Sequence, residues 1–361
     1  LFRSSHHSSY SVYSVILVRT MSGSQGLIDA VGNTPLIYLS SLSEATGCKI
    51  YGKAEWLNPT GSIKDRTAKQ IILEAEKNGD LKKGGTIVEG SGGNTGLALA
   101  ALGSAMGYKV VVTMPNSISE EKVALTRRFG AEVLLQPLVP FSNPENYAKK
   151  AESMAAEMDN AIYTNQFENM ANFRAHFTGT GAEIWKQTNG TIDAFVCACG
   201  TGGTLAGVSA FLKEASGGRV KSYLIDPYGS GLFQYVTKQL EPLQAIPGQG
   251  SKMEGVGIMR LTSNFKAATL EGATQGSDLE AINMVYYLMK HEGICMGLTG
   301  ALNLCGAVKV ARKLGAGNTV VTVMCDAGER YTSKIFNKEW LAQQNLSPED
   351  RARGDLSFVE E

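Results

Sequence analysis

Residues 194–204 read Ala-Phe-Val-Cys-Ala-Cys-Gly-Thr-Gly-Gly-Thr, an apolar run that passes directly into a glycine-rich turn. A stretch with helical spacing then continues to Lys213. The same order of apolar run, turn and helix recurs, with further apolar runs at 86–88, 109–114, 220–225 and 319–324. Apolar strands without polar alternation, separated by helices, are typical of a parallel sheet that is buried on both faces. We therefore predict an α/β fold, with ligands bound outside the carboxyl ends of the strands.

The composition is that of an ordinary globular protein with a surplus of glycine. The 361 residues include 41 Gly but only 10 Pro, whereas glycine usually makes up about 7% of a globular chain. Lys and Arg number 34, as do Asp and Glu, so the formal net charge is zero. We therefore expect no nucleic-acid partner. The apolar run at 15–18 is too short for a membrane span, and no membrane partner is expected either.

The cysteines and the N-terminal residues bear on the compartment. Six Cys are scattered along the chain, four of them in apolar runs, which indicates buried thiols in a reducing compartment such as the cytoplasm. Only four His are present and no ligand cluster can be drawn, so no metal site is predicted. Residues 1–20 hold six Ser, two Arg and no acid, as mitochondrial transit peptides do. The alternative is that Met21 is the true start.

The loop of Gly200, Thr201, Gly202, Gly203 and Thr204 suits a phosphate group. Backbone N–H groups, two hydroxyls and the dipole of the following helix converge there. A dinucleotide fingerprint would need Gly at position 205, where Leu205 stands, and no P-loop motif occurs. The remaining alternative is a tight turn that binds nothing.

Two other segments complete a possible site. Lys64 stands where a turn becomes a predicted helix at 65–77, which can hold its amine in place for a Schiff base, although a solvated surface lysine is the alternative. The loop 91–96, Ser-Gly-Gly-Asn-Thr-Gly, also precedes a helix and offers donors for a carboxylate, or is another glycine-rich turn. A phosphate cup, an amine and a carboxylate cup together are the parts of a pyridoxal-phosphate site that acts on an amino acid.

The order of these motifs along the chain resembles that of the cysteine synthase and cystathionine β-synthase family, which has the fold of the tryptophan synthase β-subunit. The resemblance covers about residues 24–340. It rests on segments 28–36, 62–66, 91–96, 166–169, 200–204, 255–257 and 328–331.

The resemblance implies two domains, each a mostly parallel twisted sheet covered by helices, with pyridoxal 5′-phosphate in the cleft between them. Residues 24–57 with 166–340 would form the larger, phosphate-binding domain. Residues 58–165 would form a smaller, mobile domain that carries the substrate loop. Residues 1–23 would be an extension or a transit-like segment, and residues 341–361 a polar tail. The resemblance also suggests a homodimer.

The resemblance further assigns roles to residues. Lys64 would form the internal aldimine with the cofactor and move the α-proton, and Asn94 would bond its phenolic oxygen. The loop 200–204 would hold the phosphate, and Gly257 with its neighbours would face the substrate amine. The substrate carboxylate would be surrounded by Ser91, Gly92, Gly93, Thr95 and Gln166.

The implied reaction is a β-replacement of the transferase class, with lyase-type elimination, in cysteine biosynthesis. An activated serine such as O-acetylserine would lose its β-leaving group to give an aminoacrylate, to which sulfide adds to form L-cysteine. Relatives that form cystathionine or cyanoalanine share these motifs and stay open as alternatives.

Two positions depart from the family pattern. Gly92 stands where the family usually has a serine, so one hydroxyl donor is lost. A family serine at the pyridine nitrogen is replaced near Gly328 by Asp326 and Ala327. We place Ala327 among the cofactor-binding residues, with Asp326 as the possible substitute, because adjacent residues of a strand face opposite ways.

Two further hypotheses follow from these residues. The departures at Gly92 and Ala327 motivate a family member that binds the cofactor but serves as a sensor or interaction subunit. Asp226, at a strand end after the 200–204 loop, would suit a nucleotide-dependent dehydrogenase, but the broken fingerprint argues against it.

Overall fold

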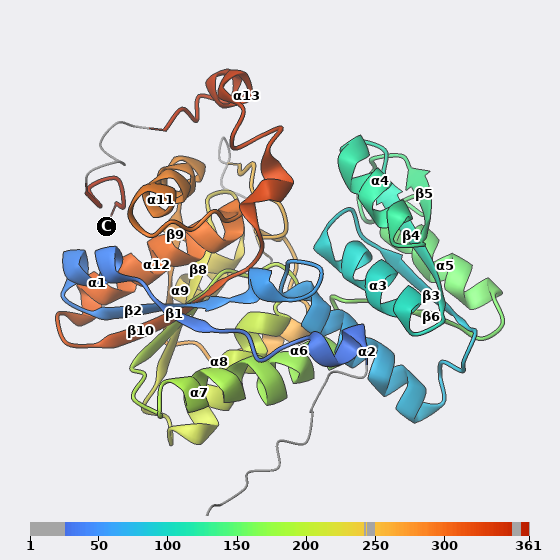
Figure 1. Cartoon of the computed structure of the whole chain (residues 1–361), viewed down its shortest axis with the longest axis horizontal. Coiled ribbons are helices and arrows are strands. Elements are labelled where there is room, and N and C mark those ends of the chain that lie inside the picture. The colour runs from blue at the N-terminus through green and yellow to red at the C-terminus, as the bar shows by residue number, and fades with distance from the viewer. Residues whose placement is uncertain (1–25, 242, 244–249, 349–354, 361) are drawn as a thin grey trace, which may run out of the picture.

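The chain folds into two sheets, each covered by helices (Figure 1). The computed structural model describes residues 26–241, 243, 250–348 and 355–360. The larger sheet has the strand order β1-β2-β10-β7-β8-β9, and the smaller one has the order β5-β4-β3-β6. Every pairing is parallel except that of β1 with β2. The predicted α/β class with mostly parallel sheets is confirmed.

The strands of the larger sheet are β1 (Leu36–Tyr38), β2 (Lys49–Ala54), β7 (Ala194–Cys197), β8 (Lys221–Pro227), β9 (Gly272–Gly276) and β10 (Thr319–Met324). Those of the smaller sheet are β3 (Thr86–Gly90), β4 (Lys109–Pro115), β5 (Glu132–Gln136) and β6 (Ala161–Tyr163).

The helices up to the middle of the chain are α1 (Ser40–Thr46), α2 (Lys64–Asn78), α3 (Asn94–Ala105), α4 (Glu120–Arg128), α5 (Tyr147–Glu157), α6 (Ala171–Ala175) and α7 (Ala182–Gln187). The later ones are α8 (Gly203–Ala215), α9 (Leu232–Lys238), α10 (Ser263–Lys266), α11 (Asp278–His291), α12 (Leu298–Leu314) and α13 (Lys338–Gln343). Short helical turns are η1 (Leu27–Ala30), η2 (Glu55–Leu57), the π-helical η3 (His176–Gly181) and η4 (Gly328–Tyr331).

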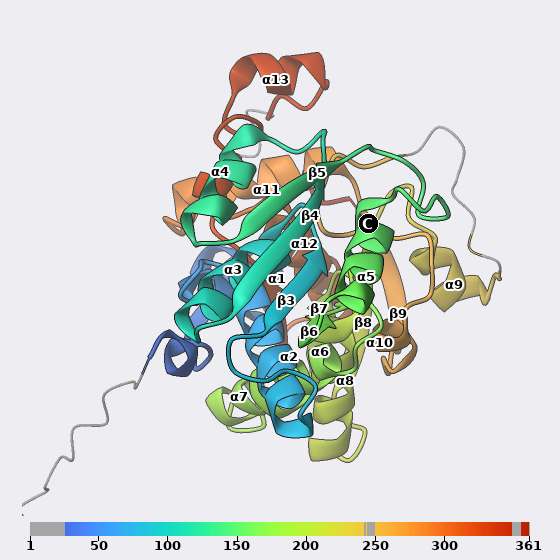
Figure 2. The same cartoon turned by 90° about the vertical axis from the view of Figure 1, so that its right-hand side faces the viewer.

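Helices lie on each side of the smaller sheet (Figure 2), and its inner strand β3 is buried on both faces. All five residues of β3 are buried. Ile87 belongs to the same apolar cluster as Leu99 of α3, whereas its neighbour Val88 packs with Ala151 of α5. Successive side chains of a strand point to opposite faces, so a strand between two helical layers is mostly apolar on both faces.

The larger sheet is packed in the same way. Val196 and Val320 belong to the cluster that holds α11 and α12, while Phe195 and Val321 lie in the cluster with Leu205 of α8. The apolar run at 194–199 is thus explained by burial on both faces. Its strand ends earlier than predicted, at Cys197, and α8 already begins at Gly203 inside the glycine-rich loop.

A buried ionic network connects the start of α2 to the larger sheet. Arg66 donates to Glu55 at 2.7 Å and to Glu183 at 2.7 Å. Lys53, on β2, pairs with the other oxygen of Glu183 at 2.7 Å. The side chains of Lys53 and Glu55 have no exposed surface, and that of Arg66 is 5% exposed. Because unpaired buried charges are costly, these contacts fix where α2 begins.

The expected domain limits stay a prediction, but the strands of each sheet lie within the residue range expected for one domain. The four strands of the smaller sheet all lie between Thr86 and Tyr163. The extension predicted for residues 1–23 lies outside the described residues. Among the described residues, no helix has both the length and the apolar character needed to cross a membrane.

The expectation of a solvated polar tail at 341–361 is wrong for the residues that can be described. Leu341, Leu346, Leu356, Phe358 and Val359 are all buried in the core of the larger unit. Arg312 of α12 donates to the backbone carbonyls of Leu356, at 3.0 Å, and Val359, at 2.6 Å. The apolar residues are too few and too scattered among polar ones to give a periodic signal in the sequence.

We expect Phe358→Ala to destabilise the protein by about 3–5 kcal/mol, since the side chain is 2% exposed and its loss leaves a cavity. Ser357→Ala is the matched control. Its side chain is exposed, and the change should stay within about 0.5 kcal/mol. Denaturant unfolding of both variants measures the difference, and equal midpoints would contradict the docking of this segment.

Candidate active site

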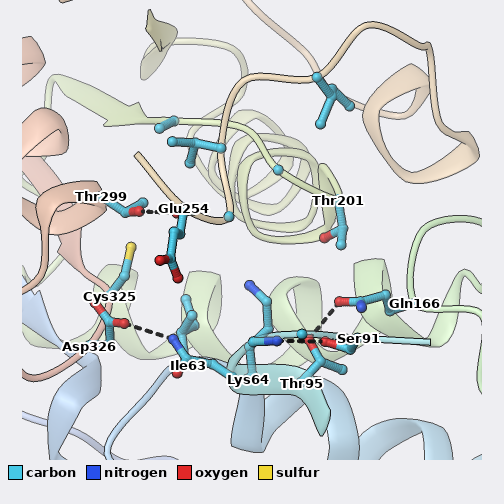
Figure 3. Close-up of a pocket in the computed structure, with 18 of the residues that line it drawn as sticks. Ile63, Lys64, Ser91, Thr95, Gln166, Thr201, Glu254, Thr299, Cys325 and Asp326 are labelled. Atoms are coloured by element: carbon cyan, nitrogen blue, oxygen red, sulfur yellow. Dashed lines mark hydrogen bonds between the residues drawn. The ribbon is translucent and has the colours of Figure 1, made fainter. Parts of the chain in front are cut away.

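A cavity of about 540 Å³ opens between the carboxyl ends of the two sheets (Figure 3). Its walls come from the loops that follow β3, β7 and β10. The structure brings most of the predicted site residues to it: Lys64, Ser91, Gly92, Gly93, Asn94, Thr95, Gln166, Gly200, Thr201, Gly202 and Thr204. Three predicted residues do not line it: Gly203, Gly257 and Ala327.

Lys64 is the first residue of α2, and its side chain points into the cavity (Figure 3). The turn before it is held from both sides. The backbone N–H of Ile63 donates to the carbonyl of Cys325 at 2.9 Å. The carboxylate of Asp65 accepts from the backbone N–H of Thr60 at 2.7 Å and also from its hydroxyl. Burial raises the pKa of Asp65 to about 6 despite these donors. The amine therefore has a fixed origin at a helix start, as the sequence predicts.

The loop 200–204 has the form of a phosphate cup. The N-cap residue of α8, Gly202, has no side chain to cap the helix, and the N–H of Gly203 donates only weakly to the hydroxyl of Thr201, at 3.4 Å, so the first turn can offer N–H groups to a ligand. Gly202 has φ +92°, and a Cβ there would lie 2.5 Å from the backbone nitrogen of Phe265. A Cβ on Gly203 would lie 2.2 Å from Oδ1 of Asn172. Because the backbone is packed this closely from behind, its N–H groups can face the cavity, and these residues fit a phosphate.

His176 supports this cup, although no motif in the sequence indicates this role. Its Nε2 lies 3.2 Å from the hydroxyl of Thr204, and its Nδ1 lies 2.9 Å from that of Thr180. Burial, together with the charges of Arg66 and Lys64, holds the pKa of His176 well below its usual range. The imidazole is therefore neutral and acts as a fixed polar support.

The loop 91–96 and Gln166 form one wall of the cavity (Figure 3). The hydroxyl of Thr95 donates to Oε1 of Gln166 at 2.6 Å. The hydroxyl of Ser91 accepts from the backbone N–H of Gly93 at 3.3 Å. A Cβ on Gly92 would lie 3.1 Å from Cδ1 of Ile118, so this glycine fits a crowded position of the loop. The polar groups predicted for a carboxylate thus come together.

The structure brings Asp326, and not Ala327, to the cavity. Strand β10 ends at Met324, and the backbone of Ala327 is bridged to Met296, away from the lining. Ala327 therefore does not line the cavity, and its placement among cofactor-binding residues stays a prediction. Oδ2 of Asp326 accepts from Asn94 at 2.7 Å and from the hydroxyl of Tyr331 at 2.6 Å. Its Oδ1 is buried and has no partner among the described residues. Burial raises the pKa of Asp326.

Gly257 is also displaced from its expected position. It lies behind the lining with φ +78°, and a Cβ there would meet the ring of Pro227 at 2.8 Å. Its neighbours Gly255, Val256 and Ile258 form this wall instead.

Several residues that sequence reasoning missed join the two sides of the cleft. Arg330 donates to Oδ1 of Asn94 at 2.5 Å. Glu254, which lines the cavity, pairs across the cleft with Lys122 of α4, and on its own side with Lys334 at 2.5 Å. The motif at Gly328–Tyr331 marked Arg330 as part of a pattern, but nothing in the sequence indicated its partner. Among the residues that the structure describes, no group of three His, Cys, Asp or Glu could hold a metal ion.

The comparisons with known proteins agree with this arrangement of amine, phosphate cup and carboxylate wall. The model of a family described as "Pyridoxal-phosphate dependent enzyme" matches residues 27–326. The chain is 48% identical over 342 residues to a cysteine synthase of Dictyostelium discoideum, covering 93% of this chain and 90% of the relative. It is also 48% identical over 339 residues to cysteine synthase 1 of Neurospora crassa, and this match covers 93% of the chain and 89% of the relative. A cystathionine beta-synthase of Dictyostelium discoideum is 32% identical to the chain over 332 residues, and this match covers 91% of the chain and 65% of the relative.

We expect Gly202→Ala to weaken the binding of pyridoxal 5′-phosphate by at least about tenfold. The new Cβ meets the backbone of Phe265, and the left-handed conformation itself costs roughly 1–2 kcal/mol for a residue with a side chain. Gly218→Ala is the matched control, because Gly218 has φ +84° but open space around it. Titration of the apoenzyme with the cofactor gives both affinities. Equal losses in the two variants would show that strain, and not the packed cup, is responsible.

Proposed function

Since the chain belongs to the pyridoxal-phosphate-dependent enzyme family, we propose that it forms L-cysteine from an activated serine, such as O-acetylserine, and sulfide. The observation that carries the proposal is the amine of Lys64, directed into a cavity between a phosphate cup and a carboxylate wall. The named cysteine synthases are more similar to the chain than the named cystathionine beta-synthase, which favours sulfide as the nucleophile.

The protein residues would hold the cofactor at three points. The loop 200–204 would hold its phosphate, the amine of Lys64 would hold its aldehyde end, and Asn94 would bond its phenolic oxygen. Bound pyridoxal phosphate supplies the electron sink for the bonds broken at the substrate. We assign the ring-facing position to Asp326, because the residue lines the cavity and its carboxylate is bonded to Asn94.

Lys64 would also move the proton at the substrate α-carbon. Its amine is within the cavity and starts from a rigid helix end, so it can take that proton and return it later. Ser91, Thr95, Gln166 and the backbone of Gly92 and Gly93 would bind the substrate carboxylate. This contact orients the α-carbon toward the amine.

Closure of the cleft would exclude water. We propose that the smaller domain, residues 58–165, moves toward the larger one when the carboxylate binds, bringing the loop 91–96 over the substrate. The ion pair of Glu254 with Lys122 joins the larger domain to the smaller one and would hold the closed form, and Lys334 of the larger domain pairs with the same carboxylate.

The other candidates have less support. Gly92 and Ala327 motivated a sensor or interaction subunit, but the 48% identity to named cysteine synthases favours an enzyme. The formation of cystathionine or cyanoalanine uses the same residues, and direct assays with homocysteine and cyanide separate these reactions.

We also propose a homodimer in the cytoplasm. The dimer rests on the family resemblance, and light scattering after size exclusion tests it. The cytoplasm is supported by the free thiols of all six cysteines, among them the buried Cys48 and Cys305. Mitochondria are the alternative if residues 1–20 act as a transit segment, which a fluorescent fusion of these residues tests.

We expect the purified protein to absorb visible light and to make L-cysteine from O-acetylserine and sulfide. Lys64→Ala should abolish the visible band and lower turnover by roughly 10²–10⁴-fold, since the amine that binds cofactor and moves the proton is gone. Lys77→Ala, an exposed change at the other end of α2, should keep both. A colourless wild-type protein, or a Lys64→Ala variant with full turnover, would overturn the proposed function.

A further inference from the structure

Glu89 is a buried carboxyl group directly behind the carboxylate wall. It lies on β3, two residues before Ser91, and is 1% exposed. Its Oε2 accepts from the hydroxyl of Thr164 and, at 3.4 Å, from the backbone N–H of Gln166. Its Oε1 accepts from Nε2 of Gln166, also at 3.4 Å. The proposed reaction gives this group no task, although it contacts a residue of the substrate site.

The hydrogen bonds form a relay from Glu89 through Gln166 to Thr95. The amide NH₂ of Gln166 donates to the carboxylate of Glu89, and the amide oxygen of Gln166 accepts from the hydroxyl of Thr95. An ionised carboxylate only accepts hydrogen bonds, so it forces this orientation. The single hydroxyl hydrogen of Thr95 is then used on Gln166. Toward the cavity, Thr95 can offer only lone pairs, which repel a substrate carboxylate.

A proton on Glu89 reverses the polarity of the whole relay. The protonated carboxyl donates to Oε1 of Gln166, and the amide turns over within the same volume. Its NH₂ then donates to the hydroxyl oxygen of Thr95, whose own hydrogen becomes free. Thr95 lines the cavity, so that hydrogen can reach a bound carboxylate.

We propose that Glu89 is a positioning residue that takes up one proton when the substrate α-carboxylate binds, and so converts Thr95 from an acceptor into a donor. The inference rests on the proposed function and extends it to the protonation state of the carboxylate wall. It requires no oxidant or further reactant, because the proton comes from solvent and returns to it on release.

The surroundings of Glu89 allow both protonation states. Burial raises the pKa of Glu89 to about 7, although Thr164 and Gln166 donate to the charged form. Tyr147 of α5 and Tyr163 of β6 face it, and burial together with the charge of Glu89 raises the pKa of both phenols, so they stay neutral. Arg260 is paired with Glu168 at 2.7 Å.

Two further groups complete these surroundings. The guanidinium of Arg260 stacks on the ring of Phe167 at 4.6 Å, and the negative charge of Glu152 on α5 helps to raise the pKa of Tyr163. Among the described residues, the hydrogen bonds of the Glu89 carboxylate come from Thr164 and Gln166 and not from Arg260 or Glu152, so a substrate anion bound at the wall is the added charge that can shift its proton.

The test measures the dissociation constant of glycine from the holoenzyme at pH values between 6 and 9. Binding is monitored by the change in visible absorbance. Glycine has the α-carboxylate and amine but no leaving group. Glu89→Gln replaces the carboxyl by a neutral amide that can donate to Gln166 at every pH. We expect equal dissociation constants at pH 6, and at pH 8 a wild-type constant higher than that of the variant by on the order of tenfold.

Glu152→Gln is the matched control, since it removes a carboxylate that is 51% exposed and outside the relay. It should follow the wild-type pH dependence. The titration of the glycine amine is common to all three proteins and cancels in their ratios. If Glu89→Gln follows the wild-type curve while both make cysteine, the relay is wrong and the proposed function stands.

A measurement on the wild type alone covers the case in which Glu89→Gln does not fold. At pH 8, the infrared difference spectrum on adding glycine should show a new C=O band of a protonated, buried carboxyl group. Its absence overturns the inference. A wild-type protein without the cofactor band would overturn the proposed function and, with it, this inference.

Discussion

The paired charges around Arg66 are the constraint on which the site depends. Arg66 follows Lys64 by two residues and is held between Glu55 and Glu183, and Lys53 balances the second of these carboxylates. None of these charges can be left unpaired in the interior without a large cost in free energy. The start of α2 therefore has one position relative to the larger sheet, and so has the amine that enters the cavity from it.

Asn94 depends on both sides of the cleft in a similar way. It begins α3 beside the smaller sheet, yet its side chain is bonded by Arg330 and Asp326, which follow β10 of the larger sheet. The residue proposed to bond the cofactor's phenolic oxygen is thus oriented by the other unit. A contact of this kind couples the approach of the two units to the geometry of the cofactor site.

The parts that the sequence could predict are those with a local signal. Apolar runs such as 86–88 and 319–324 became strands, and the loops 91–96 and 200–204 lead into helices as expected, although these helices already begin at Asn94 and Gly203. The choice between Asp326 and Ala327 depended on where β10 ends, which no neighbour in sequence reveals. The relay of Glu89 with Gln166 joins residues 77 positions apart, and Asp326 with Asn94 spans 232. Buried polar pairs leave no periodic pattern, so such contacts require the fold.

The strand pairing of the two sheets also sets an order of events during synthesis. The four strands of the smaller sheet are made in one continuous stretch, so that sheet can form while later residues are still being added. Strand β2 instead pairs with β10 and β1, and β10 is made long after it. The early strands must wait with an open edge, and an open edge can pair wrongly with other chains. The larger sheet, which carries the phosphate cup, is therefore the part most in need of protection on the ribosome.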